Sequence, residues 1–314
     1  MIAYYNTITS IHPKIIVIIG PTSSGKSELA VRIAKKFSGE VVSADSRQVY
    51  KGLDIGSGKI TKKEMQGIPH HLLDVASLKS VFTALKYQKL AKSAVRKIIQ
   101  NKKLPIICGG TGFYIDAFLY DWKLPEIPAQ RKLRNGLDKK PKEELFSMLA
   151  SLDPQRAKNI DRHNKVRLVR ALEIVMISGA PVPLFKSGKN SQYSFVKIGI
   201  KIEPDKLKSR IKKRLLKRLR VGLVKEVENL HRSGLSWKRL DDFGLEYRYV
   251  SRYIRRMINY KEMVETVERE SFRYAKRQMT WFKRDKNTIW VDPPTDEAGS
   301  LKSAFSTVRD FLSP

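Results

Sequence analysis

The stretch "VIIGPTSSGKSELA", residues 17–30, joins a short apolar run to a glycine-rich turn and then to an amphipathic segment. The turn satisfies the pattern G-x-x-x-x-G-K-[ST] at every fixed position, with the residues Gly20, Pro21, Thr22, Ser23, Ser24, Gly25, Lys26 and Ser27. Apolar residues then recur at helical spacing, at Leu29, Ala30, Ile33, Ala34 and Phe37. A strand, a loop and a helix in this order are the context in which the pattern predicts a phosphate-binding loop.

Such a loop binds phosphate mainly through its backbone. Glycines allow successive amide groups to turn inward, and the helix N-terminus adds the positive end of its dipole. We expect Lys26 to reach the outer phosphate and the hydroxyl group of Ser27 to bind a magnesium ion. All eight residues of the loop are therefore candidate phosphate ligands, and the sequence predicts a phosphorylated substrate.

Other short apolar runs alternate with longer helical patterns along the chain. The predicted strands are "KIIVIIG" (14–20), "GEVVSAD" (39–45), "KLPIICGG" (103–110), "FVKIGIKIE" (195–203) and "NTIWVD" (287–292). Continuous apolar strands separated by helices indicate a buried parallel sheet. We therefore expect an α/β fold, a P-loop NTPase-like parallel sheet flanked by helices.

The stretch 122–192 differs from the rest of the chain. It contains six prolines between helical segments and no convincing strand. We expect it to form a small all-helical insertion domain, with residues 1–121 and 193–314 as the α/β core domain. The segment 205–286 of that core has a long, basic and helical pattern.

Charge and cysteine content narrow the class of protein. The chain has 62 Lys and Arg against 31 Asp and Glu, a net charge of +31, which favours a polyanionic partner such as nucleic acid. The single cysteine, Cys108, excludes an intrachain disulfide and a multi-cysteine zinc site. The apolar run near the N-terminus is too short for a signal peptide or a membrane span. A reducing, cytosolic compartment and no membrane partner are the expectations.

Two further motifs test the phosphate-loop interpretation. A phosphoryl-transferring enzyme of this type normally has an acidic residue at the end of another strand, but the candidate strand here ends "IICGGTGFY" without one. The string "GSGKIT" at 56–61 lacks both the first glycine and a preceding strand, so we interpret it as a surface turn.

Several strings occur in an order that resembles the tRNA dimethylallyltransferase (tRNA isopentenyltransferase) family of bacterial type over nearly the whole chain. Besides the phosphate loop they are "VVSADSRQVYKGLDIG" (41–56), "GIPHHLLDV" (67–75), "GGTGFYIDAF" (109–118), "VRLVRALEI" (166–174) and "AKRQMTWFKRD" (275–285). The resemblance implies a Mg²⁺-dependent prenyl transfer. Dimethylallyl diphosphate would give its five-carbon group to the exocyclic amine of the adenosine 3′ of the anticodon in tRNA, and the loop would hold the departing diphosphate.

The acceptor chemistry suggests roles for residues at two predicted strand ends. An adenine amine must lose a proton as its bond to carbon forms, so Asp45 at the end of the second strand is the candidate general base. A helix or turn cap is the alternative role for Asp45. The resemblance places the flipped adenine beside Ser46, Arg47 and Gln48, and beside Thr111.

The resemblance also assigns basic residues to the two substrates. Arg214, or Arg210 in its place, would bind the diphosphate as the allylic bond ionises. Arg131, Arg167 and Arg170 resemble family positions that contact the tRNA anticodon stem-loop. For these arginines a solvated helix surface is the alternative.

Three other functions remain open from the sequence. An adenylate isopentenyltransferase would share the fold and the donor, but the helical insertion and the charge of +31 favour tRNA. A P-loop small-molecule kinase would share the loop, and a non-catalytic RNA-binding protein would not require Lys26, Ser27 and Asp45. The oligomeric state does not follow from the sequence, and a monomer is the expectation.

Overall fold

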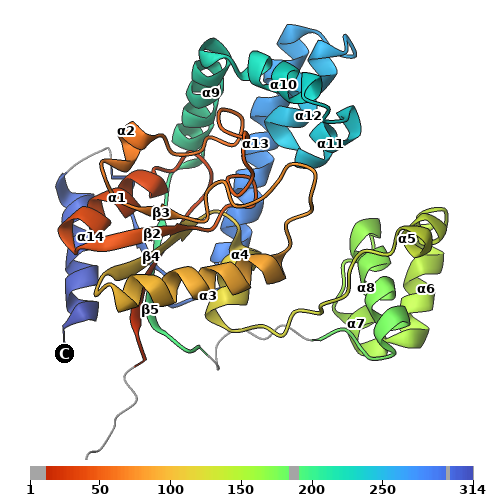
Figure 1. Ribbon diagram of the computed structural model, residues 1–314, viewed down its shortest axis with the longest axis horizontal. Helices are drawn as coiled ribbons and strands as arrows, with labels where there is room; N and C mark the ends of the chain where they lie inside the picture. Colours follow the sequence, from red (N-terminus) through yellow and green to blue (C-terminus); the bar gives the residue numbers. More distant parts are fainter. Residues whose placement is uncertain (1–11, 184–190, 295–297, 314) are drawn as a thin grey trace, which may run out of the picture. The chain divides into compact units, whose positions relative to one another are not determined.

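The computed structural model describes residues 12–183, 191–294 and 298–313, and within these the chain divides into two compact units. Unit 1 comprises residues 1–119 and 191–314, and unit 2 comprises residues 120–190. Unit 1 contains a parallel six-stranded sheet, and Figure 1 shows this sheet among its helices. Its strands are β1 (Lys14–Ile19), β2 (Gly39–Ser43), β3 (His70–His71), β4 (Leu104–Gly109), β5 (Ser194–Ile200) and β6 (Ile289–Val291).

The strand order is β3-β2-β4-β1-β5-β6, with β1 near the centre of the sheet. Every neighbouring pair is parallel; Val17, for example, lies opposite Ile107 of β4 and Lys197 of β5. The predicted α/β fold is therefore confirmed. The two-residue strand β3 was not expected, and it forms because His70 and His71 pair with Val41 and Val42.

Helices cover both faces of the sheet. The helices of unit 1 are α1 (Lys26–Lys36), α2 (Lys62–Met65), α3 (Ala84–Gln100), α4 (Gly112–Leu119), α9 (Pro204–Val221), α10 (Leu223–Arg232), α11 (Trp237–Phe243), α12 (Leu245–Ile254), α13 (Tyr260–Phe282) and α14 (Ala298–Leu312). Ile16 and Ile18 of β1 pack against Ile33 of α1 and Val308 of α14. Alternate residues point to opposite faces, and α3 packs on the opposite face, against β2 and β4. Because the sheet is buried on both faces, its strands are continuous apolar runs in the sequence.

A second apolar cluster in unit 1 lies among α9 to α13. Tyr247 and Phe243 pack there with Val227, and with Tyr50 and Leu53 from the segment that follows β2. The basic, helical pattern of 205–286 is thus a set of helices whose apolar sides bury one another and the segment after β2. Among the described residues, no helix combines the length and the apolar composition that crossing a bilayer requires.

Unit 2 is all-helical in its described part. Its helices are α5 (Arg131–Asp138), α6 (Lys142–Leu152), α7 (Pro154–Lys158) and α8 (Lys165–Ser178), which enclose a core that includes Leu145, Leu149, Leu168 and Leu172. Glu173 of α8 has no exposed surface. Its carboxylate accepts hydrogen bonds from Arg134 at 2.6 Å, from the Gln130 amide at 2.7 Å and from Arg170 at 2.5 Å.

We expect Arg170→Ala to destabilise unit 2 by about 2 kcal/mol, because it removes a charged partner from a buried carboxylate. Arg167→Ala is the matched control on the same helix, since Arg167 is exposed. Hydrogen-exchange protection of α8 measures the difference. Equal protection in the two variants would contradict the structural role of Arg170.

Because of the Glu173 carboxylate, we expect unit 2 to lose stability at low pH. Burial by itself would raise the pKa of Glu173, but the hydrogen bonds from Arg134, Gln130 and Arg170 outweigh it and lower the pKa to about 2 from the ordinary value of 4.5. A lowered folded-state pKa stabilises the fold above the unfolded-state value. Exchange protection of α8 should therefore fall as the pH drops from 4.5 towards 2, and Arg170→Ala should lose protection at a higher pH.

Candidate functional site

The carboxyl ends of three neighbouring strands meet at one edge of the sheet. β1 leads into the loop Gly20–Ser27, β2 into Asp45, and β4 into Gly110 and Thr111. Ligands of open parallel sheets bind at this edge. The structure thus brings together the phosphate loop, the candidate base and Thr111.

The phosphate loop has the backbone conformation that anion binding requires. Ser23 and Gly25 have φ angles of 63° and 97°, which turn the chain into the start of α1. In the described part of the chain, the amide groups of Ser23, Gly25 and Lys26 have no protein acceptor, whereas the Ser24 amide donates to Pro21 at 3.3 Å. Unpaired amides at a helix N-terminus form a binding site for phosphate.

The Lys26 side chain lies along this loop. Its ammonium group donates to the Pro21 carbonyl at 3.0 Å. Burial lowers the pKa of Lys26, and Arg214 lowers it further, while Cys108 and Asp45 raise it. Burial raises the pKa of the neighbouring Cys108 thiol to about 12, so it stays protonated near neutral pH. An anion that binds here would stabilise the charged form of Lys26.

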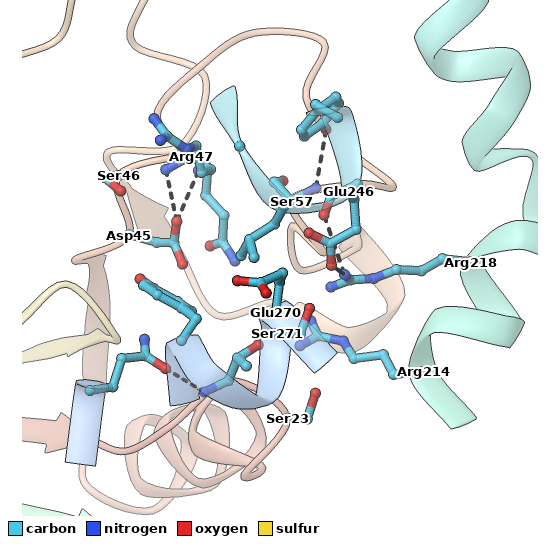
Figure 2. Close-up of a pocket in the computed structure, with 18 of the residues that line it drawn as sticks. Ser23, Asp45, Ser46, Arg47, Ser57, Arg214, Arg218, Glu246, Glu270 and Ser271 are labelled. Atoms are coloured by element: carbon cyan, nitrogen blue, oxygen red, sulfur yellow. Dashed lines mark hydrogen bonds and ion pairs between the residues drawn. The ribbon is translucent and has the colours of Figure 1, made fainter. Parts of the chain in front are cut away.

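Asp45 caps a turn with only one of its two carboxylate oxygens. Its Oδ1 accepts from the amides of Arg47 at 2.8 Å and Gln48 at 3.3 Å, as the dashed lines in Figure 2 show. The capping role considered for Asp45 is thus present. Within the described residues Oδ2 has no protein donor, and Asp45 lines the pocket drawn in Figure 2. One carboxylate can therefore both fix the turn and accept a proton.

Thr111 is held beside Asp45 by a backbone group. The Ser46 amide donates to its Oγ1 at 3.1 Å, and Tyr274, which lines the pocket, lies close to it. Burial, and after it the charge of Asp45, raises the pKa of Tyr274 to about 12, so Tyr274 remains neutral near pH 7. Tyr274 was not identified from the sequence, where it lies within the long, basic and helical pattern of 205–286.

Helix α9 supplies several of the pocket's cations. Arg210, Arg214 and Arg218 are four residues apart and share one face of the helix, and Figure 2 shows Arg214 and Arg218 with side chains pointing from α9 into the pocket. Arg210 donates to Ser24 O at 3.4 Å, and Arg218 forms an ion pair with Glu246 at 2.6 Å. Arg214 donates to Gly58 O at 3.1 Å and, in the part described, forms no ion pair. Burial, followed by Arg218, lowers the pKa of Arg214 to about 10.

The segment 54–58 contributes Gly56 and Ser57 to the pocket. The Glu226 carboxylate accepts from the amides of Asp54, Ile55 and Gly56 at 3.2, 2.7 and 3.0 Å. The Gly58 carbonyl accepts from Arg214 at 3.1 Å and from the Gln48 side chain at 3.3 Å. This segment contains the start of "GSGKIT", interpreted above as a surface turn; the turn is real, but Gly56 and Ser57 line the pocket. Nothing in the sequence near Glu226 indicates that partnership.

These elements enclose one pocket of about 890 Å³. The predicted residues that line it are Thr22, Ser23, Gly25, Lys26, Ser27, Asp45, Ser46, Arg47, Gln48, Arg210 and Arg214. Lys213, Lys217 and Arg277 add positive charge. A pocket this rich in cations suits a multiply charged anion.

Magnesium fits this donor set only together with an anion. In the described part of the chain no three His, Cys, Asp or Glu side chains form a metal-binding group. His71 is hydrogen bonded to Glu40 at 2.7 Å and His70 to Ile68 O at 2.8 Å. Mg²⁺ keeps several waters and binds few protein oxygens besides substrate phosphates. Ser27 lines the pocket, and its role as a ligand of such an ion stays a prediction.

The predicted RNA-contacting arginines belong to unit 2. Arg131 begins α5 and is exposed, and Arg167 is exposed on α8. Arg170 donates to Glu173 and to Ile127 O at 3.0 Å, so its guanidinium is partly engaged within the unit. Their contacts with RNA stay a prediction.

A phosphate loop facing an acceptor pocket is the arrangement of a group-transferring enzyme. The model of the IPP transferase family matches residues 48–285. The tRNA dimethylallyltransferase of Anoxybacillus flavithermus is 38% identical over 286 residues, covering 90% of this chain and 91% of the relative. The tRNA dimethylallyltransferase 1 of Syntrophus aciditrophicus is 40% identical over 302 residues, covering 92% and 99%.

A solved structure indicates the same family as the sequence relatives. The tRNA isopentenylpyrophosphate transferase of Bacillus halodurans superposes with a TM-score of 0.72 and 33% identity, over 95% of this chain and 96% of that one. The chain belongs to the IPP transferase family.

We expect Arg214→Gln to weaken the binding of inorganic diphosphate with Mg²⁺ by about 10- to 100-fold, because it removes a buried charge without a carboxylate partner. Arg218→Gln should weaken it less, since Glu246 already neutralises Arg218. Isothermal titration measures both. Arg220→Gln, at an exposed position of α9 outside the pocket, is the control, and an equal affinity of the Arg214 and Arg220 variants would contradict the assignment.

Proposed function

We propose that the protein transfers the dimethylallyl group of dimethylallyl diphosphate to the exocyclic amine of the adenosine 3′ of the anticodon in tRNA. The observation that carries the proposal is the pocket itself, which the phosphate loop and α9 line on one side and Asp45 lines on the other. Family membership and the names of the relatives support the reaction class.

The donor binds through its diphosphate. The free amides of the loop, Lys26 and Arg214 would contact the diphosphate oxygens, and Ser27 would hold the magnesium ion. The ion, when bound, neutralises charge on the diphosphate oxygens. As the bond between the allylic carbon and oxygen breaks, negative charge grows on the leaving group, and fixed cations stabilise that charge.

The acceptor binds at the strand ends of β2 and β4. The adenine must leave the anticodon-loop stack to enter the pocket. Its amine would lie between Asp45 and Thr111, and the Ser46 amide holds Thr111 in place. As the new nitrogen–carbon bond forms, one amine proton passes to Asp45 Oδ2, and diphosphate leaves.

The end of β4 separates this reaction from phosphoryl transfer. The strand closes with Cys108, Gly109 and Gly110, and it carries no carboxylate for a metal ion. A kinase of the phosphate-loop type holds magnesium with such an acidic residue. The net charge of +31 favours a polyanionic acceptor over a free nucleotide.

Labelled dimethylallyl diphosphate, Mg²⁺ and either unmodified tRNA or AMP should give label in the tRNA alone, with no requirement for ATP. Scintillation counting of acid-precipitated RNA, with chromatography of the nucleotide fraction, measures both acceptors. Label in AMP would indicate the adenylate transferase, and ATP hydrolysis stimulated by a small alcohol would indicate a kinase.

Asp45→Asn should leave donor and RNA bound while kcat falls by about 10²–10⁴-fold, the range for loss of a general base. Lys26→Ala should instead weaken donor binding as well, because it removes a contact made before the transition state. Single-turnover prenylation of an anticodon stem-loop, with separate binding titrations, distinguishes the two.

Asp310→Asn and Lys35→Ala make the same changes at exposed positions and are the controls. Near-normal turnover of Asp45→Asn would leave Asp45 with only its capping role. A complete loss of RNA binding would instead assign it to holding the adenine.

A further inference from the structure

Helix α13 contacts both halves of the site from successive turns. Tyr274 lies close to Thr111, Gln278 forms hydrogen bonds with the phosphate loop and with the end of β4, and Trp281 donates to Asp116 of α4 at 2.7 Å. These three side chains lie along one face of the helix because they are three or four residues apart. The helix therefore rigidly connects the phosphate loop, where the donor would bind, to the end of β4, where the acceptor would bind.

Gln278 links the phosphate loop to the end of β4 through two hydrogen bonds. It is buried, and its Oε1 accepts from the Thr22 amide at 2.9 Å. Its Nε2 donates to the Gly110 carbonyl at 2.8 Å. One planar amide thus joins the loop that would hold diphosphate to the residue before Thr111. The chain separates Thr22 from Gln278 by 256 residues.

The backbone at the end of β4 leaves room for this amide. A Cβ atom on Gly110 would lie 2.2 Å from Gln278 Nε2, closer than real Cβ contacts allow. A Cβ atom on Gly112 would lie 2.2 Å from Trp281 Cδ1. The glycines on either side of Thr111 therefore admit the side chains of α13.

The hydrogen bond between Thr22 and Gln278 also determines which backbone amides of the phosphate loop are available to a ligand. The Thr22 amide donates to Gln278, so it is not available to phosphate, whereas the amides of Ser23, Gly25 and Lys26 have no protein acceptor in the described structure. Gln278 therefore orients the loop without occupying the groups that would bind diphosphate.

We propose that Gln278 is a positioning residue that sets the distance between the donor's reacting carbon and the acceptor amine. The inference rests on the proposed function. Reacting atoms must approach to about 3–3.5 Å in line, and a misplacement of about 1 Å slows a reaction by roughly 10²-fold. A side chain that fixes both the phosphate loop and the strand end before Thr111 controls this separation.

The test is single-turnover prenylation of an anticodon stem-loop by Gln278→Leu, which keeps the size of the side chain but removes both hydrogen bonds. The rate at saturating donor and RNA should fall about 10²-fold. The dissociation constants for inorganic diphosphate and RNA should change by less than about threefold, because the free amides and the cations remain.

Gln88→Leu is the matched control. Gln88 is also buried in unit 1 and donates to the Ala117 carbonyl at 2.8 Å, but it does not line the pocket. Thermal unfolding of both variants reports their stability. A purely structural role predicts that the two variants lose stability alike and that neither is slow once folded, an outcome that would overturn the proposal.

Gly110→Ala tests the contact between Gln278 and Gly110 by changing Gly110 instead of Gln278. Its methyl group displaces the Gln278 amide, so the rate should fall in the wild-type background and fall much less in a Gln278→Ala background, where the clash is absent. Equal losses in both backgrounds would contradict the coupling.

The remaining outcomes are also distinct. A loss of diphosphate affinity that accounts for the whole rate change would make Gln278 a ligand-binding residue and overturn the positioning role. If the wild-type protein itself prenylates no RNA, the proposed function fails, whatever the variants do.

Discussion

The Ala44 carbonyl group lies where a side chain on Gly109 would have to be: a Cβ atom there would be 2.1 Å from Ala44 O. This close approach lets the ends of β2 and β4 bond to each other beyond the regular ladder. The Ala44 amide donates to Cys108 O at 2.8 Å, and the Thr111 amide donates to Ala44 O at 3.1 Å. Asp45 and Thr111 come from different strands, yet this contact makes them neighbours. A larger residue at 109 would separate the candidate base from the threonine.

Charge and burial oppose each other in the pocket. Lys26 and Arg214 both have lowered pKa values because the surrounding protein removes water from them. The protein offsets part of this with carbonyl groups, Pro21 O for Lys26 and Gly58 O for Arg214. Carbonyl dipoles stabilise a cation less than a carboxylate does. The pocket therefore favours a ligand that supplies the missing negative charge.

Local signals predicted the parts of the site that are continuous in sequence. The strands were predicted because burial on both faces requires apolar residues at every position, and the loop because its glycines and lysine have fixed spacing. β3 was missed because a two-residue strand has no periodicity. Tyr274 and Gln278 were missed because an apolar stripe at Val267, Ala275 and Phe282 dominates their helix. The hydrogen-bond partners of Gln278 lie more than 150 residues away, and no local pattern encodes such a contact.

The buried carboxylate of Glu173 divides the arginines of unit 2 into two groups. Arg134 and Arg170 form ion pairs with a group that has no exposed surface, whereas Arg131 and Arg167 are exposed. Salt screens exposed charges strongly and buried pairs weakly. If the exposed arginines bind a polyanion, an ionic strength that releases it therefore leaves the internal pairs in place. Folding of this unit and such binding would then change independently.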